Sequence, residues 1–292
     1  MRRRKTPWLL LTPFLLLTAL LLAGAAVCII QSFGVIPSMG LTRSTFRYFR
    51  ELLESGTLLA GTSISLYISF VSSVLAVVFG VGLCYALVML KRTNGRLRRL
   101  LTVPIMIPHL VVALFVTSLF AQSGLFARLL YALGLTNSQE SFPNLLYTPN
   151  SIGIILSYLW KEIPFVCYFV LPLMGNIDSS LREASANLGA SRRQTFFHVT
   201  LPLCMPAVRN AFFIILTYSF GAYELPFLLG ATIPKALPVQ AFIEYSHPDL
   251  LHRPYAMAIN TVMLAVSLLL AAVWYFMADR GQTPDTEGGD VL

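Results

Sequence analysis

Residues 58–90 read LLAGTSISLYISFVSSVLAVVFGVGLCYALVML, a run without a single Asp, Glu, Lys, Arg or His. A helix needs about 20 consecutive apolar residues to cross the hydrocarbon core of a bilayer, so this stretch can span it with some tilt. The whole chain agrees, because 56% of its 292 residues are hydrophobic and only 12% are charged. That charged share is about half of what a soluble globular domain carries. The sequence therefore predicts an integral membrane protein.

Five further apolar stretches complete an all-α fold of about six transmembrane helices. Three of them contain either no charged side chain or only His109. The fourth span carries Lys161 and Glu162 near its middle, and the fifth carries Glu224. The expected spans are residues 7–33, 58–90, 100–120, 151–173, 208–231 and 255–278.

Basic residues are unevenly distributed over the loops and indicate the orientation. They precede the first span and gather after the second and the fourth: Arg2, Arg3, Arg4, Lys5, Lys91, Arg92, Arg96, Arg98, Arg99, Arg182, Arg192, Arg193 and Arg209. By the positive-inside rule these segments and both termini, including a short tail at 279–292, face the cytoplasm of a bacterial inner-membrane protein. The net charge of +8 therefore reports the topology. We expect the basic cytoplasmic segments to contact anionic lipid, and we expect no nucleic-acid partner.

The sequence lacks the motifs of an ATP-binding site and of a metal site. No G-x-x-x-x-G-K-[ST] phosphate loop occurs, so the chain has no ATP site of that kind. His247 and His252 lie five residues apart in a loop, but a metal site needs more ligands than these two. We therefore expect a single transport domain over residues 1–292 with no catalytic residue, metal or cofactor of its own.

Residues 178–202 between the fourth and fifth spans read DSSLREASANLGASRRQTFFHVTLP. They predict two short helices with a sharp bend. Gly189 suits the end of the first helix, since glycine adopts the left-handed conformation at little cost. Ser191 and Gln194 form a capping-box pattern for the second helix, which Pro202 is expected to help close. The product is a rigid elbow on the cytoplasmic face.

This elbow resembles that of the permease subunits of type I binding-protein-dependent ABC importers. Their pattern E-A-A, three residues, G-A, an apolar position and L-P is matched here, with Ser185 as the departure. The resemblance implies that the elbow is a coupling helix that docks into a separate ATPase subunit. The residues concerned are Glu183, Ala184, Ser185, Asn187, Leu188, Gly189, Ala190, Phe196, Leu201 and Pro202. An amphipathic helix pair lying on the membrane surface is the alternative, but it does not account for the spacing.

Two stretches narrow the resemblance. Residues 219–230, SFGAYELPFLLG, look like a pattern of permeases for polyamines, iron, thiamine and phosphonates, and residues 160–165, WKEIPF, are similar to a stretch in their fourth span. The implied solute is small and polar, such as a polyamine, a metal complex, thiamine or a phosphonate. The implied partners are a second permease subunit, identical or homologous, two ATPase subunits that bind ATP and Mg, and a periplasmic or lipid-anchored solute-binding protein.

Charged and polar residues within the spans are candidates for the translocation path, namely Lys161, Glu162, Tyr223 and Glu224. An ionisable group at bilayer depth needs a partner or water, so Glu224 either pairs with Lys161 or lines the path. Two other functions use the same residues differently. An ion-gradient-driven secondary transporter would bind its ion there, and a six-span scaffold or sensor would bind a ligand through the outer loop at residues 122–150.

The predicted orientation can be tested with reporter fusions. A reporter that is active only in the periplasm should stay inactive when fused after Arg98 or after Ala278, because both positions are expected in the cytoplasm. Activity at either position would contradict the orientation and would move the elbow to the wrong side of the membrane.

Overall fold

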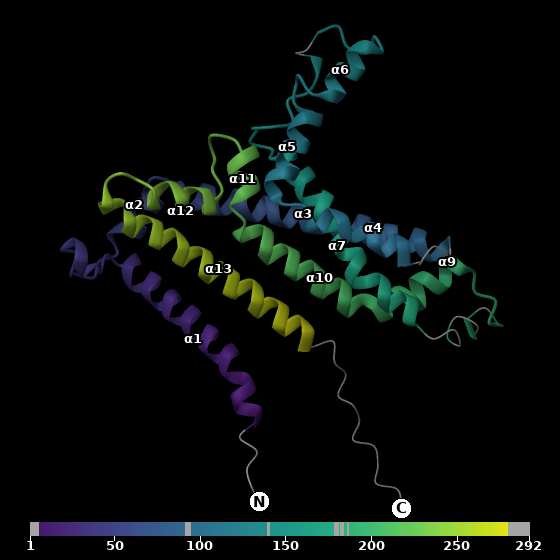
Figure 1. Cartoon of the computed structure of the whole chain (residues 1–292), viewed down its shortest axis with the longest axis horizontal. Coiled ribbons are helices and arrows are strands. Elements are labelled where there is room, and N and C mark those ends of the chain that lie inside the picture. The colour runs from purple at the N-terminus through teal and green to yellow at the C-terminus, as the bar shows by residue number, and fades with distance from the viewer. Residues whose placement is uncertain are drawn as a thin grey trace, which may run out of the picture. The chain divides into compact units, whose positions relative to one another are not determined.

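The structure is a computed structural model that describes residues 6–90, 95–138, 141–177, 181, 184–185 and 187–279. Within these ranges it is helical without a strand, apart from one isolated β-bridge between Ile36 and Leu41 (Figure 1). The α-helices are α1 Thr6–Ser32, α2 Arg47–Glu54, α3 Thr57–Met89, α4 Gly95–Met106, α5 His109–Phe120, α6 Leu125–Ala132, α7 Ile152–Asn176, α9 Arg192–Thr195, α10 Leu201–Gly221, α11 Glu224–Leu229, α12 Leu237–Tyr245 and α13 Arg253–Asp279. Short helical turns occur at Pro37–Met39, Phe196–Thr200 and Leu250–His252.

Six segments are long and apolar enough to cross a membrane, which confirms the predicted fold class. Their bounds differ from the predicted ones chiefly in the third and fifth spans. The six are Leu11–Ser32, Thr57–Met89, His109–Ala132, Ile152–Gly175, Arg192–Gly221 and Leu250–Ala278.

The third predicted span, residues 100–120, is wrong as one continuous helix. It is broken between α4, which ends at Met106, and α5, which begins at His109. Pro108 explains the break, because the ring of a proline disfavours helical backbone at the preceding residue, here Ile107. The apolar segment of this span starts at His109 and continues through α6 to Ala132.

The fifth predicted span, residues 208–231, is also corrected at both ends. Helical backbone runs from Arg192 through the π-helical turn Phe196–Thr200 (η3) into α10, so Pro202 lies in the first turn of α10 and does not close a helix. At the other end α10 stops at Gly221, and Ala222 is extended. Pro226 accounts for this, since its ring would clash with the carbonyl group of Ala222 in a continuous helix. Glu224 therefore begins a separate short helix, α11, rather than lying within a span.

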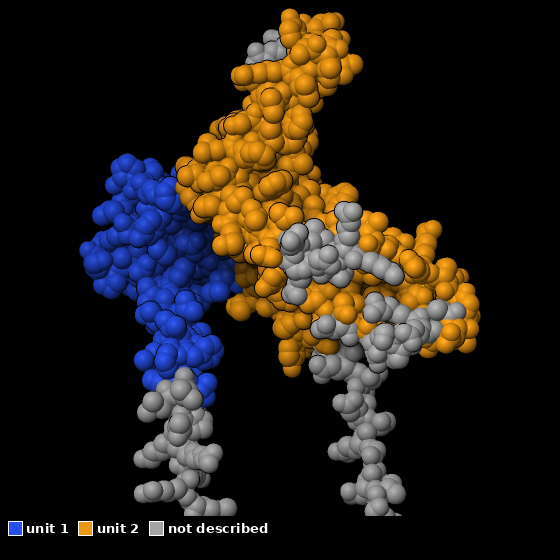
Figure 2. All heavy atoms as spheres, turned by 45° about the vertical axis from the view of Figure 1, so that its right-hand side comes forward, with its two compact units in different colours: residues 1–62, 237–266 blue, residues 63–236, 267–292 orange. Residues whose placement is uncertain are grey.

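The chain divides into two compact units, residues 1–62 with 237–266 and residues 63–236 with 267–292 (Figure 2). The first unit holds α1, α2 and α12. In it the Glu51 carboxylate of α2 accepts hydrogen bonds from the Tyr255 hydroxyl of α13 and from Arg47, at 2.6 Å. Both bonds hold the pKa of Glu51 below its usual range.

The second unit is organised around α7, which packs against α4, α5, α10 and α11. Two apolar clusters follow one another along this helix. One cluster includes Tyr158 and joins α7 to α5 and α11, and the other includes Val166 and joins α7 to α3 and α10. The polar residues of the fourth span therefore lie between two apolar contacts.

The close approach of α3 to α7 depends on Gly80. A methyl group at this position would lie 2.7 Å from Cβ of Val166, which is fully buried, whereas a methyl group at Gly82 of the same helix meets nothing within 4 Å. We expect Gly80→Ala to lower the stability of the purified protein by about 1–3 kcal/mol through overpacking. Thermal unfolding in detergent measures it.

Gly82→Ala is the matched control and should be neutral or slightly stabilising, since alanine favours helix more than glycine does. Equal unfolding midpoints for the two variants would contradict the packing of α3 on α7.

Candidate transport site and coupling elbow

The break between α4 and α5 leaves a backbone carbonyl group without its helical partner, and a charged side chain takes its place. Nζ of Lys161 on α7 donates a hydrogen bond of 2.8 Å to the carbonyl oxygen of Ile107. A cation at the C-terminal end of a helix also compensates the helix dipole. Lys161 thus supplies a hydrogen-bond donor to a carbonyl group at the helix break.

His109 links this break to the second one. Its Nδ1 lies 3.1 Å from a carboxylate oxygen of Glu224 at the start of α11, and its Nε2 lies 3.2 Å from the hydroxyl of Tyr218 on α10. A neutral ring that donates from Nδ1 to Glu224 can accept at Nε2 from Tyr218. The imidazole is largely buried, with 17% of the side chain exposed, whereas the Glu224 side chain is 61% exposed.

Glu162 is the buried carboxylate of the cluster, with 5% of its surface exposed. One of its oxygens accepts a short hydrogen bond from the Ser219 hydroxyl of α10. The other, Oε2, completes no hydrogen bond with the described residues, although the Ser72 hydroxyl, which donates to the Ser69 carbonyl group, lies close by. The pair Glu162–Ser219 therefore connects α7 to the last turn of α10.

A cavity of about 230 Å³ lies among these groups. Polar side chains from α5, α7 and α10 meet apolar walls there: Ile105, His109, Tyr158, Lys161, Glu162, Phe165, Ile214, Ile215 and Tyr218. A few convergent polar groups in a mostly apolar cavity are typical of a small-molecule site.

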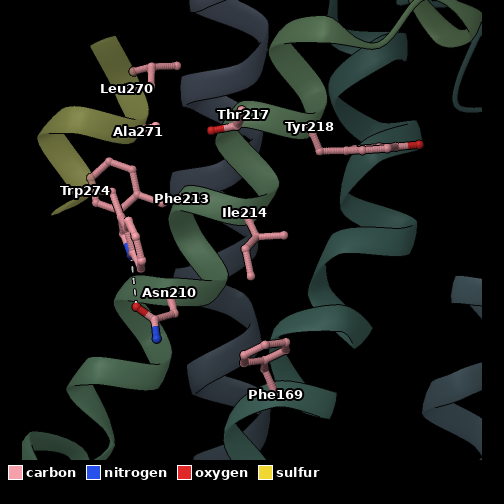
Figure 3. A pocket seen from close by; sticks show the side chains of 9 residues that line it. All are labelled: Phe169, Asn210, Phe213, Ile214, Thr217, Tyr218, Leu270, Ala271 and Trp274. Atoms are coloured by element: carbon pink, nitrogen blue, oxygen red, sulfur yellow. Dashed lines mark hydrogen bonds between the residues drawn. The ribbon is translucent and has the colours of Figure 1, made fainter. Parts of the chain in front are cut away.

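A larger hollow of about 550 Å³ lies between α7, α10 and α13 and shares Ile214 and Tyr218 with the first (Figure 3). Its lining is almost entirely apolar, and its Asn210 already accepts a hydrogen bond of 3.1 Å from the indole of Trp274. In Figure 3 Tyr218 points away from Trp274. The smaller cavity is therefore the better candidate for a polar solute.

Of the two alternatives for Glu224, the direct contact with Lys161 is not formed in this structure: Glu224 contacts His109, and Lys161 donates to the Ile107 carbonyl group. Lys161 and Glu162 do line the cavity, whereas Tyr223 stacks on Phe227 and is not part of its lining. Sequence reasoning missed Tyr158, Tyr218 and the role of His109, which follow only from the way three helices meet. Among the described residues no group of three or more His, Cys, Asp or Glu could hold a metal ion.

The elbow between α7 and α10 has the predicted bend. Gly189 has a φ of +81°, and Ser191 and Gln194 form the capping box reciprocally. The two arms are joined by a hydrogen bond of 2.9 Å between the hydroxyls of Ser185 and Thr195.

The residues predicted for coupling divide by exposure. Leu188 is 88% exposed, and Ala184, Asn187 and Gly189 are exposed as well. Phe196 is instead 2% exposed and packs edge-on against Tyr85 of α3, with ring centroids 4.6 Å apart. Leu201 packs against the same core. Ser185 and Ala190 line the hollow at the bend, and Pro202 is exposed in α10. Glu183 lies outside the described residues.

Comparison with known proteins assigns this architecture to a family. Residues 76–283 match the family described as binding-protein-dependent transport system inner membrane component. The chain belongs to this family. It is accordingly a permease subunit of an ABC importer and a multi-pass protein of the bacterial inner membrane, and as a transport component it is not an enzyme. Family membership sets aside the secondary transporter and the scaffold or sensor.

The relatives of this permease transport different solutes. It is 27% identical over 234 residues to the sulfate transport system permease protein CysT of Salmonella typhimurium, covering 80% of each chain. It is 24% identical over 235 residues to the putrescine transport system permease protein PotI of Escherichia coli, covering 80% of this chain and 77% of the relative. The putative ferric transport system permease protein FbpB 1 of Haemophilus influenzae is 26% identical over 261 residues, or 85% of this chain and 40% of its own length.

Solved structures support the fold of the permease. The crystal structure of a bacterial ABC transporter involved in the import of the acidic polysaccharide alginate matches with a TM-score of 0.70 at 20% identity, over 95% of this chain and 100% of that chain. An inward-facing structure of the MetNI methionine ABC transporter matches with a TM-score of 0.55 at 20% identity, over 78% and 95% of the two chains. An importer permease of this kind works with an ATPase and a solute-binding protein.

The Glu162–Ser219 contact can be tested by stability. Ser219→Ala removes the hydrogen bond that Glu162 accepts from α10 and leaves the Ser72 hydroxyl as the remaining hydroxyl close to the carboxylate. Leaving a buried polar group unsatisfied costs about 1–3 kcal/mol, so we expect a lower thermal unfolding midpoint for the purified permease. In the control Ser118→Ala the lost hydroxyl is exposed and bonds only to Leu114 of its own helix, so stability should change little. A Ser219→Ala protein as stable as the wild type would show that Glu162 does not depend on this serine.

Proposed function

We propose that this chain forms the translocation path of an importer for a small polar solute by alternating access, and that the segment Glu183–Pro202 couples it to the ATPase. In this proposal two permease subunits, identical or homologous, enclose the path, and two ATPase subunits bind ATP and Mg below them. A periplasmic or lipid-anchored protein delivers the solute from outside. Both ends of the chain lie in the cytoplasm, as the loop charges predict.

The observation that carries the coupling role is the exposure of Leu188 next to the Gly189 bend. A large aliphatic side chain that is 88% exposed, at the tip of an elbow whose backbone is fixed by a left-handed glycine and a capping box, is built to contact another protein. The elbow is rigid and its tip is apolar, so it can pass a displacement to the membrane helices.

A continuous run of helical backbone supports the transmission of this displacement. It leads from Arg192, in the second arm of the elbow, to Gly221. Its last turn holds the hydroxyl of Tyr218, which contacts His109, and that of Ser219, which contacts Glu162. Near its start, Phe196 ties the run to Tyr85 of α3. The π-helical turn at Phe196–Thr200 is a local irregularity of the kind often found at functional positions. A push at the elbow would therefore reach the polar cluster through one helical element.

The site past which the solute moves is, in this proposal, the cavity at the two helix breaks. Secondary transporters place their solute sites where discontinuous helices expose backbone and polar groups, and we propose the same use of helix breaks in this permease. The breaks at Ile107–Pro108 and at Ala222 bring Lys161, His109 and Glu224 together in that way. Relatives named for sulfate, ferric iron and putrescine transport support a small polar solute as a class.

The coupling role is tested by Leu188→Asp in the assembled transporter. We expect solute-stimulated ATP hydrolysis and uptake to fall at least about tenfold, because a charge at a buried contact costs several kcal/mol. The thermal stability of the isolated permease should change little, since the Leu188 side chain is 88% exposed.

Leu135→Asp is the control, because Leu135 is also an exposed leucine, at 69%, but lies in the loop between the third and fourth spans. It should keep uptake and ATP hydrolysis. Normal uptake by Leu188→Asp protein present at normal levels in the membrane would exclude the elbow tip as the ATPase contact.

A further inference from the structure

Two buried polar atoms line the smaller cavity without completing a hydrogen bond to the described part of the chain. They are the hydroxyl of Tyr158 and Oε2 of Glu162. The two residues are 1% and 5% exposed and lie four positions apart on α7, so they share one face of that helix. A buried polar atom left unsatisfied costs about 1–3 kcal/mol. The Ser72 hydroxyl lies close to Glu162 but donates to the Ser69 carbonyl group, so a ligand in the cavity is the partner that can satisfy both atoms.

The hydrogen-bonding capacity that remains in the cavity consists mainly of acceptors. The Lys161 ammonium is engaged by the carbonyl group at the end of α4, and the Tyr218 hydroxyl is engaged by His109. What remains at the buried end is one carboxylate oxygen, which only accepts when it is ionised, and the Tyr158 hydroxyl, which can accept or donate. A ligand that satisfies both atoms at once therefore brings at least one hydrogen-bond donor for the carboxylate.

The apolar lining of the cavity indicates the nature of the rest of the ligand. Ile105, Phe165, Ile214 and Ile215 line the cavity around the polar end. Apolar walls favour a ligand with carbon–hydrogen surface over a hydrated inorganic ion. A volume of about 230 Å³ is smaller than that of a pocket for a drug-sized molecule and suits a ligand with few heavy atoms.

We propose that this cavity binds an organic ammonium cation, with the ammonium group on Glu162 and Tyr158 and the carbon chain against Ile214 and Phe165. The proposal rests on the proposed transport function, because it names the solute class that passes through the same site. Lys161 stays on the Ile107 carbonyl group and leaves the carboxylate to the ligand. Anionic solutes are disfavoured at the buried end of the site.

The test uses n-butylammonium chloride as the probe and the assembled transporter in nanodiscs without ATP. We expect butylammonium to raise the thermal unfolding midpoint in a saturable manner, while sodium butyrate at equal ionic strength does not. Glu162→Gln keeps the shape and an acceptor for Ser219 but removes the charge, so the apparent affinity should fall about tenfold or more. Tyr158→Phe should lower it several-fold through loss of one hydroxyl.

Glu54→Gln is the matched control, since Glu54 is an exposed carboxylate paired with Arg50 on α2, and it should bind butylammonium as the wild type does. Non-saturable stabilisation, or unchanged affinity in Glu162→Gln protein that unfolds at the wild-type temperature, would overturn the proposal. Saturable binding of butyrate or sulfate that is lost in Lys161→Met would overturn it in favour of an anion site. Because no ATP is present, these results are independent of the Leu188→Asp test, and the coupling proposal can hold when the solute class is wrong.

Discussion

The structure depends on one constraint, which is that a backbone at bilayer depth must find its hydrogen-bond partners within the protein. An unbroken helix meets this condition by itself. Two prolines prevent it here, Pro108 after the end of α4 and Pro226 in the first turn of α11. At the first break, Lys161 donates a hydrogen bond to the Ile107 carbonyl group. Polar side chains therefore gather where the helices are interrupted, and this gathering gives an otherwise apolar bundle a place that can hold a polar solute.

Helix α7 carries side chains that bring several helices together at one site. Tyr158, Glu162 and Val166 follow at intervals of four residues, so one face of the helix carries an apolar contact, then the polar group, then a second apolar contact. The neighbours come from different helices, since Ser219 belongs to α10 and Val166 packs against Gly80 of α3. A small shift of α10 along α7 thus changes the surroundings of Glu162 directly, without an intermediate chain of contacts.

Much of this could be predicted from the sequence, because some of its signals are local. Long uncharged runs gave the six spans, and the elbow followed from Gly189 with the pair Ser191 and Gln194, all of which act over a few residues. The span bounds failed where hydropathy continues through a break, as it does from Phe220 to Leu228. Pro226 was visible in the sequence, and its clash with the Ala222 carbonyl group gives the correct end of α10. The contacts of His109 and Lys161 were not predictable in the same way, because they depend on which helices become neighbours.

The division of the elbow residues by exposure is what the proposed coupling role requires. A coupling element must be fixed to its own subunit and still offer a surface to another. Phe196 does the first by burial against Tyr85, and Leu188 is placed for the second. Between them lie the left-handed Gly189 and the capping box of Ser191 and Gln194, which restrict the backbone. The run of 30 residues from Arg192 to Gly221 is roughly 45 Å long at 1.5 Å per residue. A tilt of a few degrees of a straight run of this length would displace its far end, where Ser219 lies, by more than 1 Å, which is a large distance on the scale of a hydrogen bond.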